Sequence, residues 1–586
     1  MKRIISAVAL LLCLSLLFCS CKDSGETKNG ENKAAQVPGG YTNTVNLIPG
    51  GSIIRNRSEF KVPDNLITTE EYQKELDSIS KSAENFSDIT DEIQKRLDNL
   101  DLKLQEQIVY NTDDITECEG AHYYLSAEGD DTASGTSPET AWQSIKKLNS
   151  VKLTPGDLVS FRRGDKFRGV VHVTSGVTFG AYGTGYKPQI LGAFDGTQWD
   201  WIPTETPNVW KLDHRFGNKD LREFPNNDAD KLTLDLSIAV LVKPDGTEIN
   251  GIRSSYLAKL DKNYKFCYLG PNYNNSHSDT DGGKTAGNHI YLYCEDGDPN
   301  EVFTDIEIGV NLSVFNEKNL YIEDVHLNNL EILYGRGPFW PGDCKNISVT
   351  YCIAGWQGGF DDGSQGTPYG GGGGVWGNCE GFLWDHCYIF QQWDSGVSPQ
   401  YNGSSNPVKH FYDFNTTNCL FKGCKWTLEY WLYQKLTTED IIKNLKFDYN
   451  ICRDGGKGFN PNKRMESAYV MTWGYESTCY DSSISHNVFD RPYALTYEIG
   501  GFEQLEAGTD VKSPVDKFSI ERMPTMEGNI HIQIQGKKFA TVHKGCEYKD
   551  SSHDLLLKYK KEDLQSFIDQ GFEKNSLFLF APKEDK

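Results

Sequence analysis

The sequence is poor in basic residues, in methionine and in segments with helical periodicity. Its 586 residues include 59 lysines and arginines against 82 aspartates and glutamates, which gives a formal net charge of −23. Because nucleic-acid binding depends on basic side chains that contact phosphates, this composition argues against it, and more mildly against a polyanionic substrate. The chain also lacks a CxxC motif or a His–Cys spacing typical of zinc sites, although it has 15 cysteines. What it does contain, 56 glycines, 30 tyrosines, 29 phenylalanines and 12 tryptophans, favours strands, turns and aromatic surfaces.

A long apolar run stands at the extreme N-terminus, in MKRIISAVALLLCLSLLFCSCKDSGE. It is short for a transmembrane span and follows Lys2 and Arg3, which is typical of a secretion signal. The segment resembles a bacterial lipoprotein signal over residues 1–21, with Cys21 as the lipidated first residue of the mature chain and Cys19 as a weaker alternative. The CKDSGE that follows resembles lipoproteins of Bacteroidetes-like bacteria. The resemblance implies a protein anchored by lipid in the outer membrane, surface-exposed or periplasmic; simple secretion is the alternative. Loss of Lys2 and Arg3 would change the net charge from −23 to −25.

Two N-terminal segments precede the main domain. Residues 22–65 are rich in glycine, asparagine, lysine and serine, and we expect them to form a tether. Residues 66–112 place side chains of one face alternately four and three positions apart, which over more than four heptads predicts a coiled coil and hence a stalked homo-oligomer. The alternative is one amphipathic helix lying on the main domain. The positions concerned are Tyr72, Leu76, Ile79, Ala83, Phe86, Thr90, Ile93, Leu97, Leu100 and Leu104.

The pattern changes at residue 122, where HYYLSAEGDDTASGTSPETAWQSIKKL predicts a strand, a turn and a helix. Ser137 followed by Pro138 is typical of a helix start, with serine as the cap and proline in the first turn. This stretch closely resembles the opening segment of right-handed parallel β-helix proteins of the pectin-lyase-like type. The resemblance implies an all-β fold over residues 119–586, a right-handed parallel β-helix in which the helix covers the open first coil.

Six strand-like segments from residue 319 onward repeat a common pattern. They are NLYIEDVHLNN, NISVTYCIAGW, GFLWDHCYIFQQW, DFNTTNCLFKGC, NLKFDYNICRDGG and SSISHNVFDRPY. Their alignment places at one equivalent position, 27 to 37 residues apart, Val325, Cys352, Cys387, Cys419, Asn450 and Asn487. Such residues form columns in stacked coils about 4.8 Å apart. We therefore expect the three cysteines to be stacked interior thiols, with disulfide pairing as the alternative.

Two further segments depart from this repeat. Residues 195–310 contain strand patterns with Asp-Gly turns in IAVLVKPDGTEIN and NHIYLYCEDGDPNE, which predict an inserted β-subdomain. Residues 520–586 contain a last strand pair, NIHIQIQGKKFATV, and a helix, KEDLQSFIDQGF, which we expect to cover the far end of the stack.

Glu429 is the strongest candidate for a catalytic group. It lies in CKWTLEYWLYQ, an apolar and aromatic run in which a carboxylate is costly unless it is paired or functional. Partial burial would raise its pKa, which suits a group that donates a proton at neutral pH. Asp394, in QQWDSGVSPQ one coil earlier, is the predicted partner, and the alignment sets Val375, Val397 and Leu428 at one equivalent strand position.

Both acids also have a structural interpretation. Asp394 lies in an Asp-Ser-Gly turn, which forms without any catalytic role. For Glu429 the alternative is a buried ion pair with Lys422 or Lys425.

The loop GWQGGFDDGSQGTPYGGGGGVWGN, residues 355–378, contributes two more acids, Asp361 and Asp362, which either assist catalysis or keep the loop solvated. Tryptophans on corners and groove walls are residues on which sugar rings stack, and core packing is their alternative role. The predicted substrate-binding residues are Trp356, Trp376, Trp393, Trp426, Trp431 and Arg464.

The paired acids and tryptophans resemble those of β-helix glycoside hydrolases that act on xylosides and pectic side chains. In these enzymes, acids on neighbouring coils serve as nucleophile or base and as acid. An Asp-x-Gly turn and a Glu-Tyr-Trp strand of related exported proteins match Asp394 and Glu429, whereas the further glutamate expected near Trp376 is absent from GGGVW. The resemblance implies a cell-surface enzyme that hydrolyses poly- or oligosaccharides without a cofactor.

Two alternative functions remain at this point. A polysaccharide lyase of the pectate-lyase type would take its base from CRDGGKGFNPNKRMES, which contains Arg453, Lys457, Lys463 and Arg464, and would hold Ca²⁺ at the Asp361–Asp362 pair. A non-catalytic glycan-binding protein on a coiled-coil stalk is the other alternative.

Overall fold

The computed structural model describes residues 46–48, 51–52, 60–216, 235–254, 256–268, 289–317, 321–361, 368–401, 409–432, 441–458, 467–472, 479–499, 523–542 and 555–582. Several predicted features lie outside the described residues, namely Cys21, most of the tether, Asp362, Lys463 and Arg464, and of Asp361 only the backbone is described.

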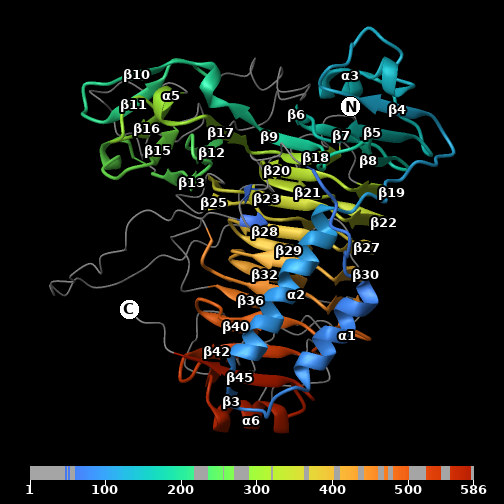
Figure 1. Ribbon diagram of the computed structural model, residues 1–586, viewed down its shortest axis with the longest axis vertical. Coiled ribbons are helices and arrows are strands. Elements are labelled where there is room, and N and C mark those ends of the chain that lie inside the picture. The colour runs from blue at the N-terminus through green and yellow to red at the C-terminus, as the bar shows by residue number, and fades with distance from the viewer. Residues whose placement is uncertain are drawn as a thin grey trace, which may run out of the picture.

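The chain is mainly β and winds as a stack of coils whose strands join three long sheets (Figure 1). The first sheet contains, in spatial order, β4 (His122–Leu125), β5 (Leu158–Arg162), β8 (Thr178–Tyr182), β19 (Tyr321–Asn328), β22 (Asp343–Thr350), β27 (Cys379–Asp385), β30 (His410–Thr417), β34 (Lys446–Asp448), β38 (Ser483–Ser485) and β41 (Thr525–Glu527). Beside it lie β33 (Ile441–Lys443) and β37 (Cys479–Tyr480).

The second sheet contains β6 (Lys166–Arg168), β9 (Gln189–Asp195), β20 (Glu331–Tyr334), β23 (Ile353–Gln357), β28 (Tyr388–Gln392), β31 (Leu420–Lys422), β35 (Ile451–Arg453), β39 (Val488–Asp490), β42 (Ile530–Ile534), β45 (Leu577–Ala581) and β3 (Ser87–Asp88). The third sheet contains β26 (Gly374–Val375), β29 (Ser395–Tyr401), β32 (Trp426–Leu432), β36 (Ala468–Thr472), β40 (Leu495–Ile499), β43 (Lys538–Val542) and β44 (Leu555–Lys558).

Successive coils pair in parallel in all three sheets. Thus β27, β28 and β29 of one coil lie beside β30, β31 and β32 of the next. In the coils that precede the third sheet, a smaller parallel sheet is formed by β7 (Val171–Val173), β18 (Ser313–Glu317) and β21 (Gly337–Phe339). The parallel pairing of residues some thirty positions apart confirms the repeat predicted from the sequence.

A column of small side chains runs along the stack at the corner before the second sheet. We call it the corner column, and it consists of Cys352, Cys387, Cys419, Asn450, Asn487, Asn529 and Ser576. Neighbouring members of the column are hydrogen-bonded from coil to coil, and the Cys387 N–H donates to Cys419 Sγ at 3.3 Å. The Cys419 N–H donates to Asn450 Oδ1 at 2.9 Å, and the Asn450 N–H to Asn487 Oδ1 at 2.9 Å. The predicted stacking of interior thiols is confirmed, because these cysteines are buried and free.

One member of the predicted column was misplaced. Val325 lies opposite Ile347 inside the first sheet, and the position equivalent to Cys352 on that coil is taken by Leu330, whose oxygen accepts from the Ile353 N–H. The error arises because this coil has a leucine where the later coils have a cysteine or an asparagine, so residue type does not mark the position. The left-handed corner residue before it, Asn329 with a φ of 57°, has a counterpart in each of those later coils.

Both ends of the stack are covered, as predicted. At the first coil, α3 (Ile145–Ser150) buries Ile145 and Leu148 in the core. Its cap is Ser144, whereas the predicted cap Ser137 begins only a 3₁₀ turn, η1 (Pro138–Thr140). At the far end, α6 (Lys561–Asp569) buries its apolar side, and β3 pairs with β45 and so covers the last strand edge.

Residues 66–112 form two helices, α1 (Thr69–Ser80) and α2 (Asp91–Val109), so the prediction of one continuous helix is wrong. Thr90, counted as a heptad position, caps α2 instead. Both helices lie along the stack (Figure 1), and their apolar positions pack on the outer face of the second sheet. The apolar stripe is thus buried within the chain and is not available for a coiled coil. Packing on the main domain was the alternative interpretation.

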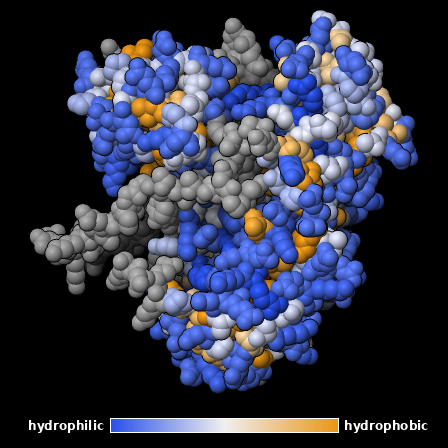
Figure 2. Space-filling model, viewed as in Figure 1, coloured by the Kyte–Doolittle hydropathy of each residue, from blue (hydrophilic) through white to orange (hydrophobic). Residues whose placement is uncertain are grey.

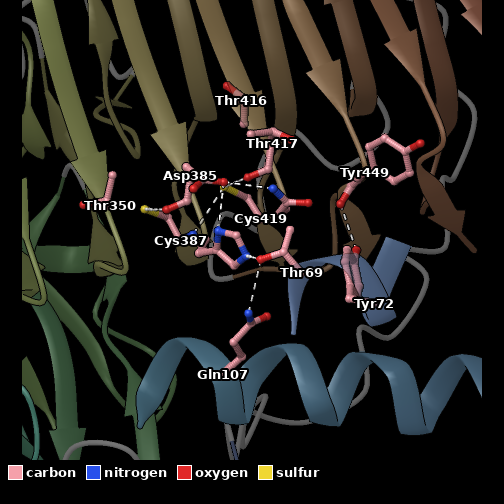
Figure 3. A network of polar contacts seen from close by, with 12 residues as sticks. Thr69, Tyr72, Gln107, Thr350, Asp385, Cys387, Thr416, Thr417, Cys419 and Tyr449 are labelled. Atoms are coloured by element: carbon pink, nitrogen blue, oxygen red, sulfur yellow. Dashed lines mark hydrogen bonds and ion pairs between the residues drawn. The ribbon is translucent and has the colours of Figure 1, made fainter. Parts of the chain in front are cut away.

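Helix α1 contacts one coil after another along its length. The contacts join Thr69 to His386, Gln73 to Asn418, Tyr72 to Tyr449 and Asp77 to His486, each at 2.8 Å. Side chains four residues apart on a helix advance by about 6 Å, close to the coil spacing of about 4.8 Å, which is why α1 can follow the stack. Figure 3 shows Thr69 and Tyr72 facing the coils, with Gln107 of α2 donating to Thr69 at 3.4 Å.

The predicted insertion consists of mostly antiparallel strands. One part forms a five-stranded sheet of its own, and the other extends the second sheet from the edge of β9. The insertion contains β10 (Trp201–Pro203), β11 (Val209–Leu212), β12 (Leu236–Val242), β13 (Glu248–Asn250), β14 (Ile252–Arg253), β15 (Lys265–Tyr268), β16 (Ile290–Tyr293), α5 (Pro299–Val302) and β17 (Asp305–Val310). The predicted hairpin is β12–β13, which turns at Gly246 with a φ of 83°.

The face that carries α1 and α2 is mainly hydrophilic (Figure 2). The two helices therefore replace an apolar sheet surface by a polar one. Within the described residues, no helix combines the length and the apolar character needed to cross a bilayer.

Candidate functional site

Glu429 lies in the middle of β32, on the outer face of the third sheet. Its neighbours Leu428 and Tyr430 belong to the interior core, and alternation along the strand turns Glu429 to the opposite side. In the sheet it lies between Ser398 of β29 and Met471 of β36.

The Glu429 carboxyl is buried, at 4% exposure, and held by polar side chains. Its Oε2 accepts a hydrogen bond from Gln400 Nε2 at 2.7 Å and one from Ser398 Oγ at 3.2 Å. Burial, followed by repulsion from Asp394, raises the pKa of Glu429 to about 8, although Lys425 and the hydrogen bonds act in the opposite direction. At neutral pH this carboxyl therefore retains its proton.

Asp394 lies at the corner immediately before β29. The chain bends there, and the Asp394 backbone oxygen accepts hydrogen bonds from the N–H groups of Lys425 at 3.1 Å and Trp426 at 3.2 Å on the next coil. Its side chain also carries a charge partner, because Lys425 Nζ lies 3.4 Å from Asp394 Oδ1. The same ammonium group lies 3.2 Å from the centre of the Trp426 ring. A buried lysine thus holds Asp394 from one side.

The two acids interact although they are offset along neighbouring strands. Asp394 is level with Lys425, four residues before Glu429, and its charge is the second largest cause of the raised pKa of Glu429. The predicted ion pairs of Glu429 are wrong: Lys425 pairs with Asp394, and Lys422 lies 3.1 Å from Asp101 of α2.

The first strand of the third sheet is shifted from its predicted register. Val375 lies opposite Pro399 rather than Val397, whereas Val397 does lie opposite Leu428. The glycine-rich run before it is a closely packed strand: a Cβ built at Gly374 would approach the Ser398 oxygen to 1.9 Å. Glycine is needed here because two backbones meet beside the residues that hold Glu429.

Two of the predicted sugar-stacking tryptophans belong to the core. Trp356 is fully buried and packs edge-on against Phe390. Trp393 is 3% exposed and packs over the backbone of Gly358 and Gly359. A ring without exposed surface cannot stack on a sugar, so these two predictions are wrong.

The other three tryptophans follow the third sheet. Trp426 is buried, in a small outer cluster with Met471 and beneath the Lys425 ammonium. Trp431 and Trp376 are partly exposed, and a hydrogen bond from Trp431 is among the influences on the pKa of Glu429. These two rings remain candidates for contact with substrate.

The residues proposed for a lyase are differently placed. Arg453 lies under α2 on the outer face of the second sheet, 2.7 Å from Asp98, 3.2 Å from Asp101 and 3.5 Å from Asp490. It is therefore an ion-pair residue and not an available base. Lys457 lies 3.6 Å from Asp454. Among the described residues, no group of acids, histidines and cysteines could hold a metal ion.

Sequence reasoning missed three residues of this site. Ser398 and Gln400 hold the Glu429 carboxyl, and Lys425 holds Asp394. The signal was present, because Ser398 and Gln400 alternate with apolar positions in SGVSPQ and so share the outer face with their neighbour on the next coil.

No family model and no curated protein matches the chain. Solved structures to which it is similar include XylC in complex with xylose, at 11% identity over 79% of this chain and 86% of that one, with a TM-score of 0.38. Another is named only as a glycoside hydrolase, at 8% identity over 80% and 98%, with a TM-score of 0.40. A third is the GH136 lacto-N-biosidase of Eubacterium ramulus, at 12% identity over 82% and 70%, with a TM-score of 0.30. These solved structures include glycoside hydrolases.

Proposed function

We propose that the protein is a glycoside hydrolase whose stack is a right-handed parallel β-helix, with Glu429 as the acid and Asp394 as the nucleophile or base. The observation that carries the proposal is the pair of unlike carboxyl environments on neighbouring coils. Glu429 is buried and keeps its proton to about pH 8, while Asp394 faces the Lys425 ammonium. Carboxyl groups in contrasting environments are the arrangement that glycosidic cleavage requires.

In the proposed reaction, Glu429 gives its proton to the glycosidic oxygen while the bond from that oxygen to the anomeric carbon breaks. Asp394 either attacks the anomeric carbon or takes a proton from the attacking water, according to the separation of the two carboxyl groups in the substrate complex. Ser398 and Gln400 orient the Glu429 carboxyl, and after the transfer they stabilise the carboxylate by donating to Oε2.

The proposed location follows from the N-terminal segment. Cys21 would carry the lipid that anchors the protein in the outer membrane, and the N-terminal residues would connect that anchor to α1. This part of the proposal depends on the signal-like sequence alone, and metabolic labelling with a fatty acid, compared between the wild type and Cys21→Ala, tests it.

Product chemistry tests the enzymatic proposal. The wild type and Glu429→Gln are incubated with a panel of 4-nitrophenyl glycosides and natural oligosaccharides, and both reducing ends and ultraviolet-absorbing unsaturated ends are measured. Hydrolysis predicts new reducing ends without unsaturation, and their loss in Glu429→Gln. Unsaturated ends would show a lyase, and binding without turnover by the wild type would show a glycan-binding protein.

A further inference from the structure

A pair of tryptophans stands on the outer face of the stack, toward the first coils from Glu429. Trp340 and Trp376 lie with ring centroids 5.1 Å apart and planes tilted by 39°. Both are partly exposed, and the residues before them, Phe339 and Val375, are buried in the interior core. Each tryptophan thus follows the last, inward-facing residue of a strand, and its partial exposure places the indole at the surface.

The pair rests on backbone that carries no side chains. A Cβ built at Gly337 would lie 2.4 Å from Trp340 Nε1, and one at Gly374 would lie 3.0 Å from Trp340 Cζ3. The Trp340 indole N–H donates to the Gly371 backbone oxygen at 3.4 Å. The glycines thus leave room for the Trp340 indole to lie close to the chain. This gives the glycine-rich run a role besides the close contact of two strands.

The pair is aligned with the site through the third sheet. The Trp376 N–H donates to the Pro341 oxygen, at 2.9 Å, which ties the coil of Trp340 to that of Trp376. Since Val375 lies opposite Pro399, Trp376 is level with Gln400, which in turn lies opposite Trp431. With strands about 4.8 Å apart, Trp376 is one strand from Gln400 and two strands, about 10 Å, from Trp431.

Gln400 therefore lies between the aromatic pair and the Glu429 carboxyl. It donates to the Glu429 carboxyl, and it lies in the same row as Trp376 on one side and Trp431 on the other. A row of partly exposed indoles beside a catalytic carboxyl is suited to successive rings of a bound sugar chain, because sugar rings pack their C–H faces on aromatic surfaces.

We propose that Trp340 and Trp376 form a distal sugar subsite, so that the substrate is an oligosaccharide chain lying along the stack axis rather than a single glycoside. This inference rests on the proposed function and deepens it. The subsite binds a sugar ring by stacking, and the Arg336 guanidinium, 5.5 Å from the centre of the Trp376 ring, lies beside it. It sets the minimum length of a well-bound chain, and it does not take part in bond cleavage.

Calorimetric binding to the inactive Glu429→Gln protein tests the subsite. The ligands are a monosaccharide and a hexasaccharide of whichever series is turned over or, if none is turned over, of each series in the panel. Replacing both Trp340 and Trp376 by alanine in that background is expected to weaken hexasaccharide binding ~10-fold or more and to leave monosaccharide binding unchanged. Replacing both by phenylalanine keeps aromatic surface and should restore most of the loss.

One control variant and the phenylalanine variant separate the outcomes. Trp210→Ala removes a partly exposed tryptophan of the inserted subdomain and should change neither affinity. Hexasaccharide affinity that is unchanged in the alanine variant, or lost equally in the phenylalanine variant, would overturn the subsite. An absence of turnover by the wild type would instead refute the proposed hydrolase, while the chain-length dependence of binding still decides the subsite.

Discussion

At the scale of single residues, the raised pKa of Glu429 is set by a balance of neighbours that can be altered one at a time. The Lys425 ammonium lowers this pKa, although burial and Asp394 outweigh it. Lys425→Met should therefore raise the pKa further above 8 and move the loss of activity at high pH upward by about one unit, besides lowering the rate through Asp394. The measurement is kcat/KM between pH 5 and pH 10, with Lys457→Met as the control. A downward shift, or none, would contradict this account of the site.

The same residue should make the wild-type protein less stable as the pH rises. The pKa of Glu429 is about 8 in the folded chain against an ordinary value of 4.5, so the folded state binds the proton more tightly. Between these values, raising the pH penalises the fold, by on the order of a few kcal/mol for a buried carboxyl. Glu429→Gln removes the penalty and should unfold at a higher temperature than the wild type at pH 8.5 but not at pH 5. Glu301→Gln, an exposed position, should show no such difference.

For single residues, prediction from the sequence succeeded at some positions of the site and failed at others. Glu429 was identifiable because a carboxylate in an apolar strand is costly unless it is paired or functional. Trp356 and Trp393 were mistaken for surface residues because the local sequence around a corner tryptophan does not show whether its ring turns inward or outward. Here the outer face of the second sheet is itself covered, so a ring directed outward is still buried.

At the scale of elements, the corner column holds neighbouring coils in register. Asn487 Oδ1 accepts from the N–H of Asn450, and its side-chain nitrogen donates to Phe447 O at 2.7 Å and Asn529 Oδ1 at 3.1 Å. Asn487→Ala removes these buried hydrogen bonds to the coils on either side and should cost ~3 kcal/mol of unfolding free energy. Chemical unfolding checks this, with the exposed Asn300 as the control position. A cost no larger than that of Asn300→Ala would refute the role given to the column.

The sequence predicted which residue types form the column, but it did not predict every strand alignment correctly. Spacing and residue type together located the cysteine and asparagine positions, since a repeat with small interior side chains admits few alignments. The error at Val325 arose because Leu330 takes the place of the small side chain of the column, and the error at Val375 arose where a glycine run changes the count between strands. Neither change alters the hydrophobic pattern, so both are hidden in the sequence.

At the scale of the whole molecule, α1 and α2 act as an external brace of the stack. The heptad pattern alone could not show this, because a stripe that fits a second helix also fits an apolar sheet. Leu97→Asp should therefore destabilise the folded chain by ~3 kcal/mol or more, since it places a charge against the second sheet. A coiled coil would instead lose its oligomeric state while the main domain stayed stable, so thermal unfolding and light scattering on the same sample distinguish the two.

The central claim concerns the protonated Glu429 beside Asp394 and is tested most directly by the pH dependence of turnover. The measurement is kcat from pH 4 to pH 10 for the wild type and Glu429→Gln, on the glycoside that the panel identifies, with binding followed in parallel. We expect wild-type turnover to fall as the pH rises through about 8, and the variant to lose ~100-fold or more while still binding. Wild-type rates in Glu429→Gln would contradict the account.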